Sequence, residues 1–191
     1  MSNQPLLQKL IISIEQHQAR TIHQPDLAQA GVLVAITDEA DPHLVLTRRA
    51  QHLNSHSGEV AFAGGKQDAT DPDIVFTALR EAHEEINLLP NQVNVIGPLD
   101  QVVSRFGYVV TPIVGITPAD VTLVANPEEL DAIFKVPLRF FLESEPHDYF
   151  ERGNFSIPSF HYDGFRIWGL TAMMITEMLN NHLNANIAIR F

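Results

Sequence analysis

Residues 64–88 of the chain read GGKQDATDPDIVFTALREAHEEINL and hold three glutamates, Glu81, Glu84 and Glu85, within five residues. On a helix, at about 100° per residue, these side chains share a sector roughly a quarter-turn wide. Like charges at this spacing destabilise a helix by roughly 0.2–0.5 kcal/mol per pair, and only Arg80 is spaced to pair with one of them, Glu84. The next sector is apolar, so the stretch predicts a helix with a carboxylate cluster beside a buried stripe of Val75, Leu79, Ala82 and Ile86.

The ends of this helix also have sequence signals. Asp71 before Pro72 predicts Asp71 as the N-cap and Pro72 as the first helical residue, where its missing N–H costs nothing. Asn87 follows Ile86, and asparagine is the usual alternative to glycine in the left-handed residue that ends a helix. We therefore expect a helix from residue 72 to about residue 86.

Two explanations of the glutamate cluster are open from the residues alone. A solvated charged face is one, although such faces usually interleave lysines at helical spacing. A bound divalent cation is the other, since it would remove the repulsion. Carboxylate oxygens are hard ligands, and the chain has no cysteine, so the ion would be Mg²⁺ or Mn²⁺.

Composition sets the class of protein. The chain has 191 residues, of which 45% are hydrophobic and 18% charged, as expected of one globular domain over residues 1–191. The formal net charge of −11 argues against a nucleic-acid surface. An amphipathic helix is predicted at about residues 4–18, and no run approaches the roughly 20 apolar residues of a membrane span, so we expect a cytoplasmic protein. The sequence does not give the oligomeric state, and a homodimer is compatible with it.

The rest of the chain predicts further strands and helices around the stretch at residues 64–88. Together they predict a mixed sheet flanked by helices, an α+β or α/β sandwich. The elements are several β-rich runs, a short strand in the loop after residue 53, a short helical turn within 127–142, a hairpin across Asp163 and Gly164, and a closing helix. The strands are expected at residues 30–36, 43–49, 94–103, 108–116, 156–162 and 165–170, and the closing helix at 171–183.

The spacing within residues 64–88 resembles the Nudix box, G-x5-E-x7-R-E-U-x-E-E-x-G-U, where U is aliphatic. Gly65, Asp71 and the run REAHEEINL from Arg80 take the positions of the motif. Three departures are present: Asp71 replaces Glu, the next spacer is one residue longer, and Asn87 replaces Gly. The first two are what the coenzyme A pyrophosphatase branch of the family shows.

A second signature of that branch, L-L-T-x-R-[SA]-x3-R-x3-G-x3-F-P-G-G, lies upstream. The matching residues are Thr47, Arg49, Ala50, Gly58, Phe62, Gly64 and Gly65, and the departures are Val45, Asn54 and Ala63. Residues 110–116 and 166–172 also look like this branch, so the resemblance covers residues 30–183.

The resemblance implies a Nudix-type α/β/α sandwich and a metal-dependent pyrophosphatase. The small-molecule substrate would be coenzyme A or an acyl derivative, cleaved to 3′,5′-ADP and 4′-phosphopantetheine or its acyl form. Glu81 and Glu85 would bind the metal, with Glu84 as a further ligand or water-holding residue and Arg80 orienting the glutamates. Substrate contacts would come from Arg49, Lys66, Gly64 and Gly65.

Two other functions fit the same residues. One is hydrolysis of another nucleoside diphosphate derivative, such as NADH or ADP-ribose, because specificity in this superfamily resides outside the box. The other is a non-catalytic nucleotide-binding module, which would be expected to lose the acids of the box.

Several residues have a structural interpretation that competes with a functional one. We expect Glu128 and Glu129 to cap a turn, although they could supply a carboxylate to the site. Ser104 and Arg105 could meet a substrate phosphate, but a solvated loop is the default. His52 and His56 are four residues apart, but Leu53 stands where a zinc protease motif needs Glu, so we reject that motif. We assign His83 to the surface, and we assign to the core the residues Phe165, Trp168 and Met173.

Overall fold

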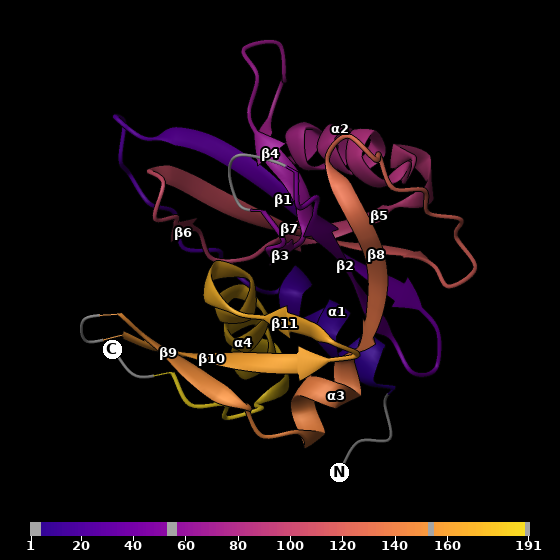
Figure 1. Ribbon diagram of the computed structural model, residues 1–191, viewed down its shortest axis with the longest axis vertical. Coiled ribbons are helices and arrows are strands. Elements are labelled where there is room, and N and C mark those ends of the chain that lie inside the picture. Colours follow the sequence, from indigo (N-terminus) through magenta and orange to yellow (C-terminus); the bar gives the residue numbers. More distant parts are fainter. Residues whose placement is uncertain (1–4, 53–56, 153–154, 190–191) are drawn as a thin grey trace.

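A central mixed sheet organises the molecule (Figure 1). The computed structural model describes residues 5–52, 57–152 and 155–189. β1 (Ala28–Asp38) and β7 (Tyr108–Pro118) run parallel through 11 paired residues at the centre of the sheet. The other strands of this sheet are β2 (His43–Arg49), β3 (Val60–Ala61), β4 (Ala63–Lys66), β5 (Asn94–Pro98), β6 (Val102–Val103) and β8 (Leu130–Pro137), in the order β3-β2-β1-β7-β5 with β4, β6 and β8 paired alongside.

Helices cover both faces of this sheet. α2 (Ile74–Ile86) lies over one face, and α1 (Leu6–Glu15) and α4 (Gly169–Leu183) lie against the other (Figure 1). Beyond α4 lies a second sheet of three strands, in the order β11-β10-β9. Its strands, with two short helices, complete the fold: β9 (Asp148–Arg152), β10 (Phe155–Tyr162), β11 (Phe165–Ile167), α3 (Leu138–Glu143) and the 3₁₀ helix η1 (Pro90–Gln92). The α+β prediction, with a mixed sheet between helices, is confirmed.

β1 is apolar on both faces because it is buried between these layers. Its side chains alternate, so Leu33 and Ala35 join the core on the α2 side, whereas Val34 and Ile36 join the core on the side of α1 and α4. A central parallel strand covered on both faces is typically continuous in hydrophobic residues, as residues 30–36 are.

The two terminal helices pack on each other and on the sheet. α1 buries Leu7, Leu10 and Ile14, but it is shorter than the predicted 4–18, and residue 4 lies outside the described residues. Side chains add to this apolar contact: the Ser13 hydroxyl lies 2.9 Å from Nδ1 of His182. In the part of the chain that the structure describes, no helix has the length and apolar character needed to cross a bilayer.

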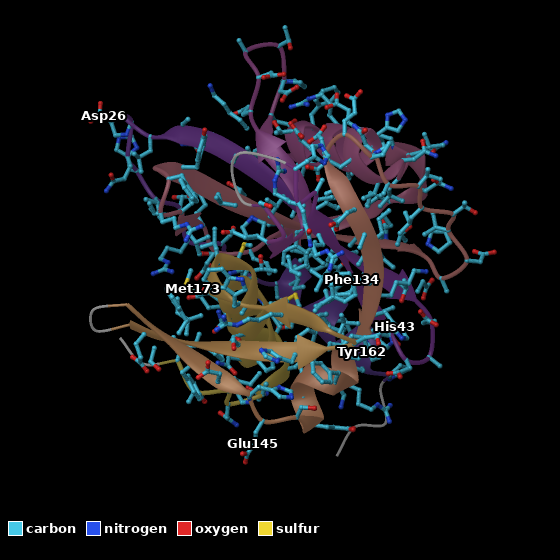
Figure 2. All side chains as sticks on the ribbon, in the orientation of Figure 1. Asp26, His43, Phe134, Glu145, Tyr162 and Met173 are labelled. Carbon is cyan, nitrogen blue, oxygen red and sulfur yellow. The ribbon has the colours of Figure 1, made fainter. Side chains whose placement is uncertain are left out.

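The segment between α2 and α4 differs from the prediction. β8 occupies residues 130–137 of the range 127–142, the short helical element within that range is α3 from Leu138, and β9 was not predicted. β8 pairs with β2 across its whole length, and Phe134 on β8 stacks on Phe165 at a centroid distance of 3.9 Å. Figure 2 labels Phe134. The stability of β8 therefore comes from a partner strand 81 to 94 residues earlier, which the local sequence cannot show.

The hairpin prediction is confirmed, with one boundary changed. Tyr162 pairs with Phe165 across Asp163 and Gly164, whose φ angles of 48° and 80° fit the turn expected for Asp-Gly. The last predicted strand was expected to reach residue 170, but β11 ends at Ile167 and α4 begins at Gly169.

The start of α2 was predicted wrongly, and its end correctly. The N-cap is Asp73, whose carboxylate accepts a hydrogen bond from the N–H of Phe76 at 2.8 Å. Asp71 is instead turned toward Arg80, a contact described below. At the other end Asn87 has φ 55° and ψ 30°, and its N–H bonds to the carbonyls of Ala82 and His83.

We predict that Asn87→Gly leaves the free energy of unfolding nearly unchanged. Asn87→Val should lower it by about 1–2 kcal/mol, because a β-branched residue is strained in the left-handed conformation. Urea denaturation of the two variants beside the wild type measures the difference. Equal midpoints for the two variants would contradict this account of the helix end.

Candidate active site

The site begins where β4 passes beneath α2. β4 pairs with β1 through Gly64–Val32 and Gly65–Gly31. A Cβ atom on Gly65 would lie 2.5 Å from the carboxylate carbon of Glu81, and one on Gly64 would lie 2.5 Å from the carbonyl oxygen of Gly31. Only glycine fits at position 64, where the obstacle is backbone. A side chain at position 65 would have to displace the Glu81 carboxylate, so Gly65 allows this carboxylate of α2 to rest directly on the strand backbone.

Glu85 is the buried member of the cluster. Its side chain is 4% exposed, and Oε2 accepts a hydrogen bond from the N–H of Gly64 at 3.1 Å. Burial, with a smaller effect of the negative charges of Glu129 and Glu81, raises the pKa of Glu85 to about 8, against the opposing effects of the Gly64 hydrogen bond and Arg49. The guanidinium of Arg49 lies 3.7 Å from Oε1. Glu85 is therefore a desolvated carboxylate with one distant countercharge among the described residues.

Arg80 and Asp71 form the framework of the site. Nε and NH2 of Arg80 donate to the two carboxylate oxygens of Asp71 at 3.1 and 3.0 Å, a bidentate pair. Asp71 also accepts hydrogen bonds from the hydroxyl of Thr77 and the N–H of Asp68. The hydrogen bond from Arg80 is the largest cause that lowers the pKa of Asp71 to about 2. Asp71 thus remains charged and fixes the position of Arg80, in place of the predicted capping role.

The same guanidinium reaches the exposed edge of the cluster. NH1 of Arg80 lies 2.9 Å from Glu81 and 3.0 Å from Glu84. The sequence predicted only the Glu84 contact, because helical spacing shows i,i+4 partners but not the loop residue Asp71 or the rotamer that turns Glu81 inward. Burial raises the pKa of Glu81, whereas Glu84 remains 54% exposed. The exposure of the side chain therefore decreases from Glu84 at the surface through Glu81 to Glu85 in the interior.

Arg49 and Lys66 occupy different places around the cluster. Arg49 ends β2 and points at Glu85, and its buried Nε has no hydrogen-bond partner among the described residues. Lys66 ends β4 with an exposed side chain, and its carbonyl accepts a hydrogen bond from Arg80 at 3.3 Å. The structure therefore brings Arg49 to the carboxylates and places Lys66 at the rim.

The loop before β8 contributes Asn126, whose place the sequence did not indicate, and Glu129, which the sequence named as a possible carboxylate of the site. The N–H of Asn126 donates to the carbonyl of Glu85 at 2.8 Å, and its side-chain amide lies 3.4 Å from Glu129. Asn126 also caps the following turn, since its Oδ1 accepts from the N–H of Glu128. The capping role expected of the two glutamates falls to Asn126, and Glu129 acts on the charge of Glu81 and Glu85. No local signal identifies this effect of Glu129, because Glu129 and Glu85 are 44 residues apart in the chain.

Other candidates lie away from the carboxylates or outside the described residues. His83 is exposed on α2, as expected, and His52 contacts the carbonyl of Glu128 at 3.2 Å. Asn54 and His56 lie outside the described residues.

The donor set suits a hard divalent cation. Within residues 5–52, 57–152 and 155–189, no three histidine, aspartate or glutamate side chains stand together as a ready metal site. The guanidinium of Arg80 lies against the oxygens of Glu81 and Glu84 in their present positions. A cation would stabilise the ionised form of Glu85, which burial disfavours and for which Arg49 at 3.7 Å is weak compensation, so these residues fit a bound ion.

Comparison with known proteins assigns the family. The NUDIX domain matches residues 27–151, and the chain belongs to this family of hydrolases, which act on pyrophosphate bonds of small nucleotide compounds with divalent cations. Proteins of Escherichia fergusonii, Escherichia coli and Shigella boydii, each described as uncharacterized Nudix hydrolase NudL, are 42% identical over 154 residues, covering 78% of this chain and 80% of theirs.

Two solved structures share the fold. The Ap4A hydrolase of C. elegans, in a binary complex, has a TM-score of 0.50 with 15% identity over 61% of this chain and 85% of its own. The Nudix hydrolase RenU of M. smegmatis has a TM-score of 0.50 with 20% identity over 59% of this chain and 72% of its own. Both confirm the Nudix fold predicted from the sequence.

We predict that Gly65→Ala lowers kcat by about 100-fold, because the added methyl group would displace the Glu81 carboxylate by about an ångström. The free energy of unfolding should fall by about 1–3 kcal/mol. Gly97→Ala is the matched control, since a Cβ there meets only Ile14 at 3.6 Å, an ordinary contact. Full activity in Gly65→Ala would show that Glu81 is not needed where it lies.

Glu85→Gln tests the buried carboxylate through its pH dependence. The folded-state pKa of about 8 exceeds the ordinary 4.5, so the metal-free protein should lose stability as the pH rises from about 4.5 to about 8. Glu85→Gln should remove this slope and be more stable than the wild type at pH 8, as measured by thermal unfolding in EDTA. Glu15→Gln, an exposed change on α1, should retain the slope. A slope unaltered in Glu85→Gln would contradict the assignment.

Proposed function

We propose that the protein is a metal-dependent pyrophosphatase that hydrolyses the diphosphate of coenzyme A or acyl-coenzyme A. The observation that carries this proposal is the contact between Arg49 and Glu85 at 3.7 Å. Arg49 belongs to the upstream signature and Glu85 to the Nudix box, so the two sequence signatures that favour the coenzyme A branch meet in one site. Hydrolysis would give 3′,5′-ADP and 4′-phosphopantetheine, or its acyl derivative.

The chemistry requires a concentration of positive charge that the chain alone lacks. A diphosphate is multiply anionic and repels an attacking water or hydroxide, and the net charge of −11 adds to that repulsion. Mg²⁺ or Mn²⁺ bound by Glu81, Glu85 and Glu84 would neutralise the phosphates and lower the pKa of bound water.

The remaining roles belong to side chains of this site. Arg80, fixed by Asp71, would orient Glu81 and Glu84. Arg49 has a buried Nε donor that could bind a phosphate oxygen, and Lys66 offers a cation at the rim. The proton released when water attacks phosphorus would pass to a carboxylate of the cluster, where burial raises the pKa toward the operating pH.

We propose further that residues 1–191 act as one Nudix hydrolase domain. The family match ends at residue 151, but the core that includes β1 also contains Ile14 of α1 and Ile175 of α4. Removing α4 would expose this core, so the terminal helices belong to the same folding unit. A homodimer and a cytoplasmic location remain predictions; light scattering on the purified protein tests the first.

A substrate panel tests the main proposal. We expect hydrolysis of coenzyme A and acetyl-coenzyme A in the presence of Mg²⁺ or Mn²⁺, abolished by EDTA, with 3′,5′-ADP identified by chromatography. Glu81→Gln, which keeps the shape but not the charge, should abolish most turnover, and stabilisation by Mg²⁺ in thermal unfolding should shrink. Cleavage of NADH or ADP-ribose with coenzyme A left intact would assign the site to another nucleoside diphosphate derivative.

Arg49→Ala tests the phosphate contact. A charge-assisted hydrogen bond contributes about 1.5–3 kcal/mol, so kcat/KM for coenzyme A should fall roughly 10- to 100-fold. Arg139→Ala is the control, because Arg139 is an exposed arginine on α3. Comparison with dephospho-coenzyme A shows which phosphate is bound: a larger loss on coenzyme A assigns Arg49 to the 3′-phosphate, and an equal loss assigns it to the diphosphate. Unchanged kcat/KM on both substrates would remove Arg49 from the site.

A further inference from the structure

A cluster of arginines and aromatic rings lies at the sheet edge beside β3. The loop between β6 and β7 presents Arg105 and Phe106, with the guanidinium carbon of Arg105 4.6 Å from the centroid of the Phe106 ring. Arg105 also lies 5.9 Å from the ring of Trp168, and Arg166 lies 5.4 Å from the same ring. We call these four residues the aromatic–arginine cluster.

The cluster is exposed but anchored. Side-chain exposure is 43% for Arg105 and 47% for Arg166, and Phe106 is 51% exposed. Trp168 is partly buried, with its ring edge-on to Phe150 at 5.4 Å. This differs from the expectation that Trp168 would be core, since it belongs to neither of the two core clusters.

Two contacts place the cluster next to the carboxylate site. Arg105 pairs with Glu59 at 2.5 Å, and the carbonyl of Glu59 accepts a hydrogen bond from the N–H of Arg49 at 3.0 Å. On the Trp168 side, the hydroxyl of Thr171 donates to the carbonyl of Val60 at 2.9 Å. Hydrogen-bonded strands lie about 5 Å apart, so the cluster is one strand away from Arg49, which itself contacts Glu85.

The chemistry of the cluster matches a phosphorylated aromatic heterocycle. Aromatic faces and guanidinium planes stack on bases, and the outer N–H groups of arginine bind phosphate oxygens. Each of the two exposed arginines pairs with an acid, Arg105 with Glu59 and Arg166 with Asp148 at 3.7 Å, so they counter the repulsion of a chain of net charge −11 where a phosphate displaces these carboxylates. The ion pair of Arg105 with Glu59 is partly exposed, and such pairs contribute little, so a phosphate can compete for the guanidinium.

We infer that the aromatic–arginine cluster is the nucleoside subsite, which binds the phosphorylated adenosine half of the substrate while its diphosphate lies at the glutamates. Phe106 and Trp168 supply the stacking surface, and Arg105 and Arg166 bind the phosphate of the ribose. This inference rests on the proposed function for the identity of the nucleotide. The expectation that Ser104 and Arg105 form only a solvated loop would then be wrong.

Trp168 provides a direct test, because it is the only tryptophan of the chain. With the wild-type protein in EDTA, titration with 3′,5′-ADP should quench its fluorescence saturably. Adenosine should bind about tenfold more weakly, because it lacks the phosphates. No saturable change with 3′,5′-ADP at millimolar concentration would overturn the inference. So would a fluorescence change that follows protein concentration instead of nucleotide, since that indicates contact between copies of the chain.

Variants identify the residues that bind. Phe106→Ala removes one stacking ring and should raise the Kd for 3′,5′-ADP about tenfold, within the range of a base–aromatic stack. Arg105→Gln should weaken the binding of 3′,5′-ADP more than the binding of adenosine, whereas a purely structural role of Arg105 would affect the binding of both ligands equally. Val103→Ala, an exposed change on the same hairpin, is the control and should bind as the wild type does. Wild-type Kd values in both Phe106→Ala and Arg105→Gln would overturn the subsite.

Product analysis separates this inference from the proposed function. Coenzyme A could fail to be hydrolysed while 3′,5′-ADP quenches the fluorescence of Trp168 and the variants weaken its binding. In that case the subsite is supported and the substrate assignment fails. If coenzyme A is hydrolysed and 3′,5′-ADP leaves the fluorescence unchanged, the pyrophosphatase stands and the subsite fails. In the supported case, Phe106→Ala should also raise KM for coenzyme A about tenfold while kcat changes less than twofold.

Discussion

The bidentate pair of Arg80 with Asp71 is the interaction on which the arrangement of the site depends. The Asp71 side chain is 1% exposed, so its charge requires the guanidinium that neutralises it. The same guanidinium contacts Glu81 and Glu84 and the carbonyl of Lys66, and thereby joins the loop before α2, the helix itself and the end of β4. Removing either partner would leave the other charge without its bidentate partner and would release the loop before α2 from the helix.

Close backbone packing adds a second constraint. Gly64 and Gly65 bring β4 so near to β1 and α2 that a side chain larger than hydrogen would overlap a carbonyl or a carboxylate. Glu85 is consequently enclosed, held by one peptide N–H and the distant Arg49. The protein thus maintains a carboxylate that burial disfavours as an anion, a condition that binding of a cation would relieve. Pairs of acids with opposed environments, such as Asp71 and Glu85, are a common feature of enzyme sites.

The residues that follow the family match, which ends at residue 151, contribute to the core and to the edge of the sheet. Residues after 151 form β10, β11 and α4, which complete the core under the sheet and carry Arg166 and Trp168 to the edge beside β3. The glutamates lie on the α2 side of the same sheet (Figure 1). This division is consistent with a superfamily in which the box supplies the chemistry and other segments supply specificity, since stacking surfaces and cations can vary without disturbing the carboxylates.

Much of the fold could be read from the sequence because its signals are local. The limits of β2 follow from a β-rich run bounded by turn residues, and the left-handed Asn87 and the Asp163–Gly164 turn follow from the conformational preferences of single residues. The glutamate positions on α2 follow from helical spacing. β8 was missed because its stability comes from β2, a distant partner, and β9 was missed although its partner β10 follows it directly in the chain.

The sequence by itself determined the helix, its carboxylates and the glycines that pass beneath them, because covalent spacing and backbone preference are properties of neighbouring residues. Only the tertiary structure decided which acid is charged, buried or paired. Asp71 was predicted as an N-cap, yet it pairs with Arg80 because the loop folds back over the helix and Asp73 takes the cap. The raised pKa of Glu85 and the place of Trp168 likewise depend on segments far apart in the chain, since desolvation and charge act through space and not along the sequence.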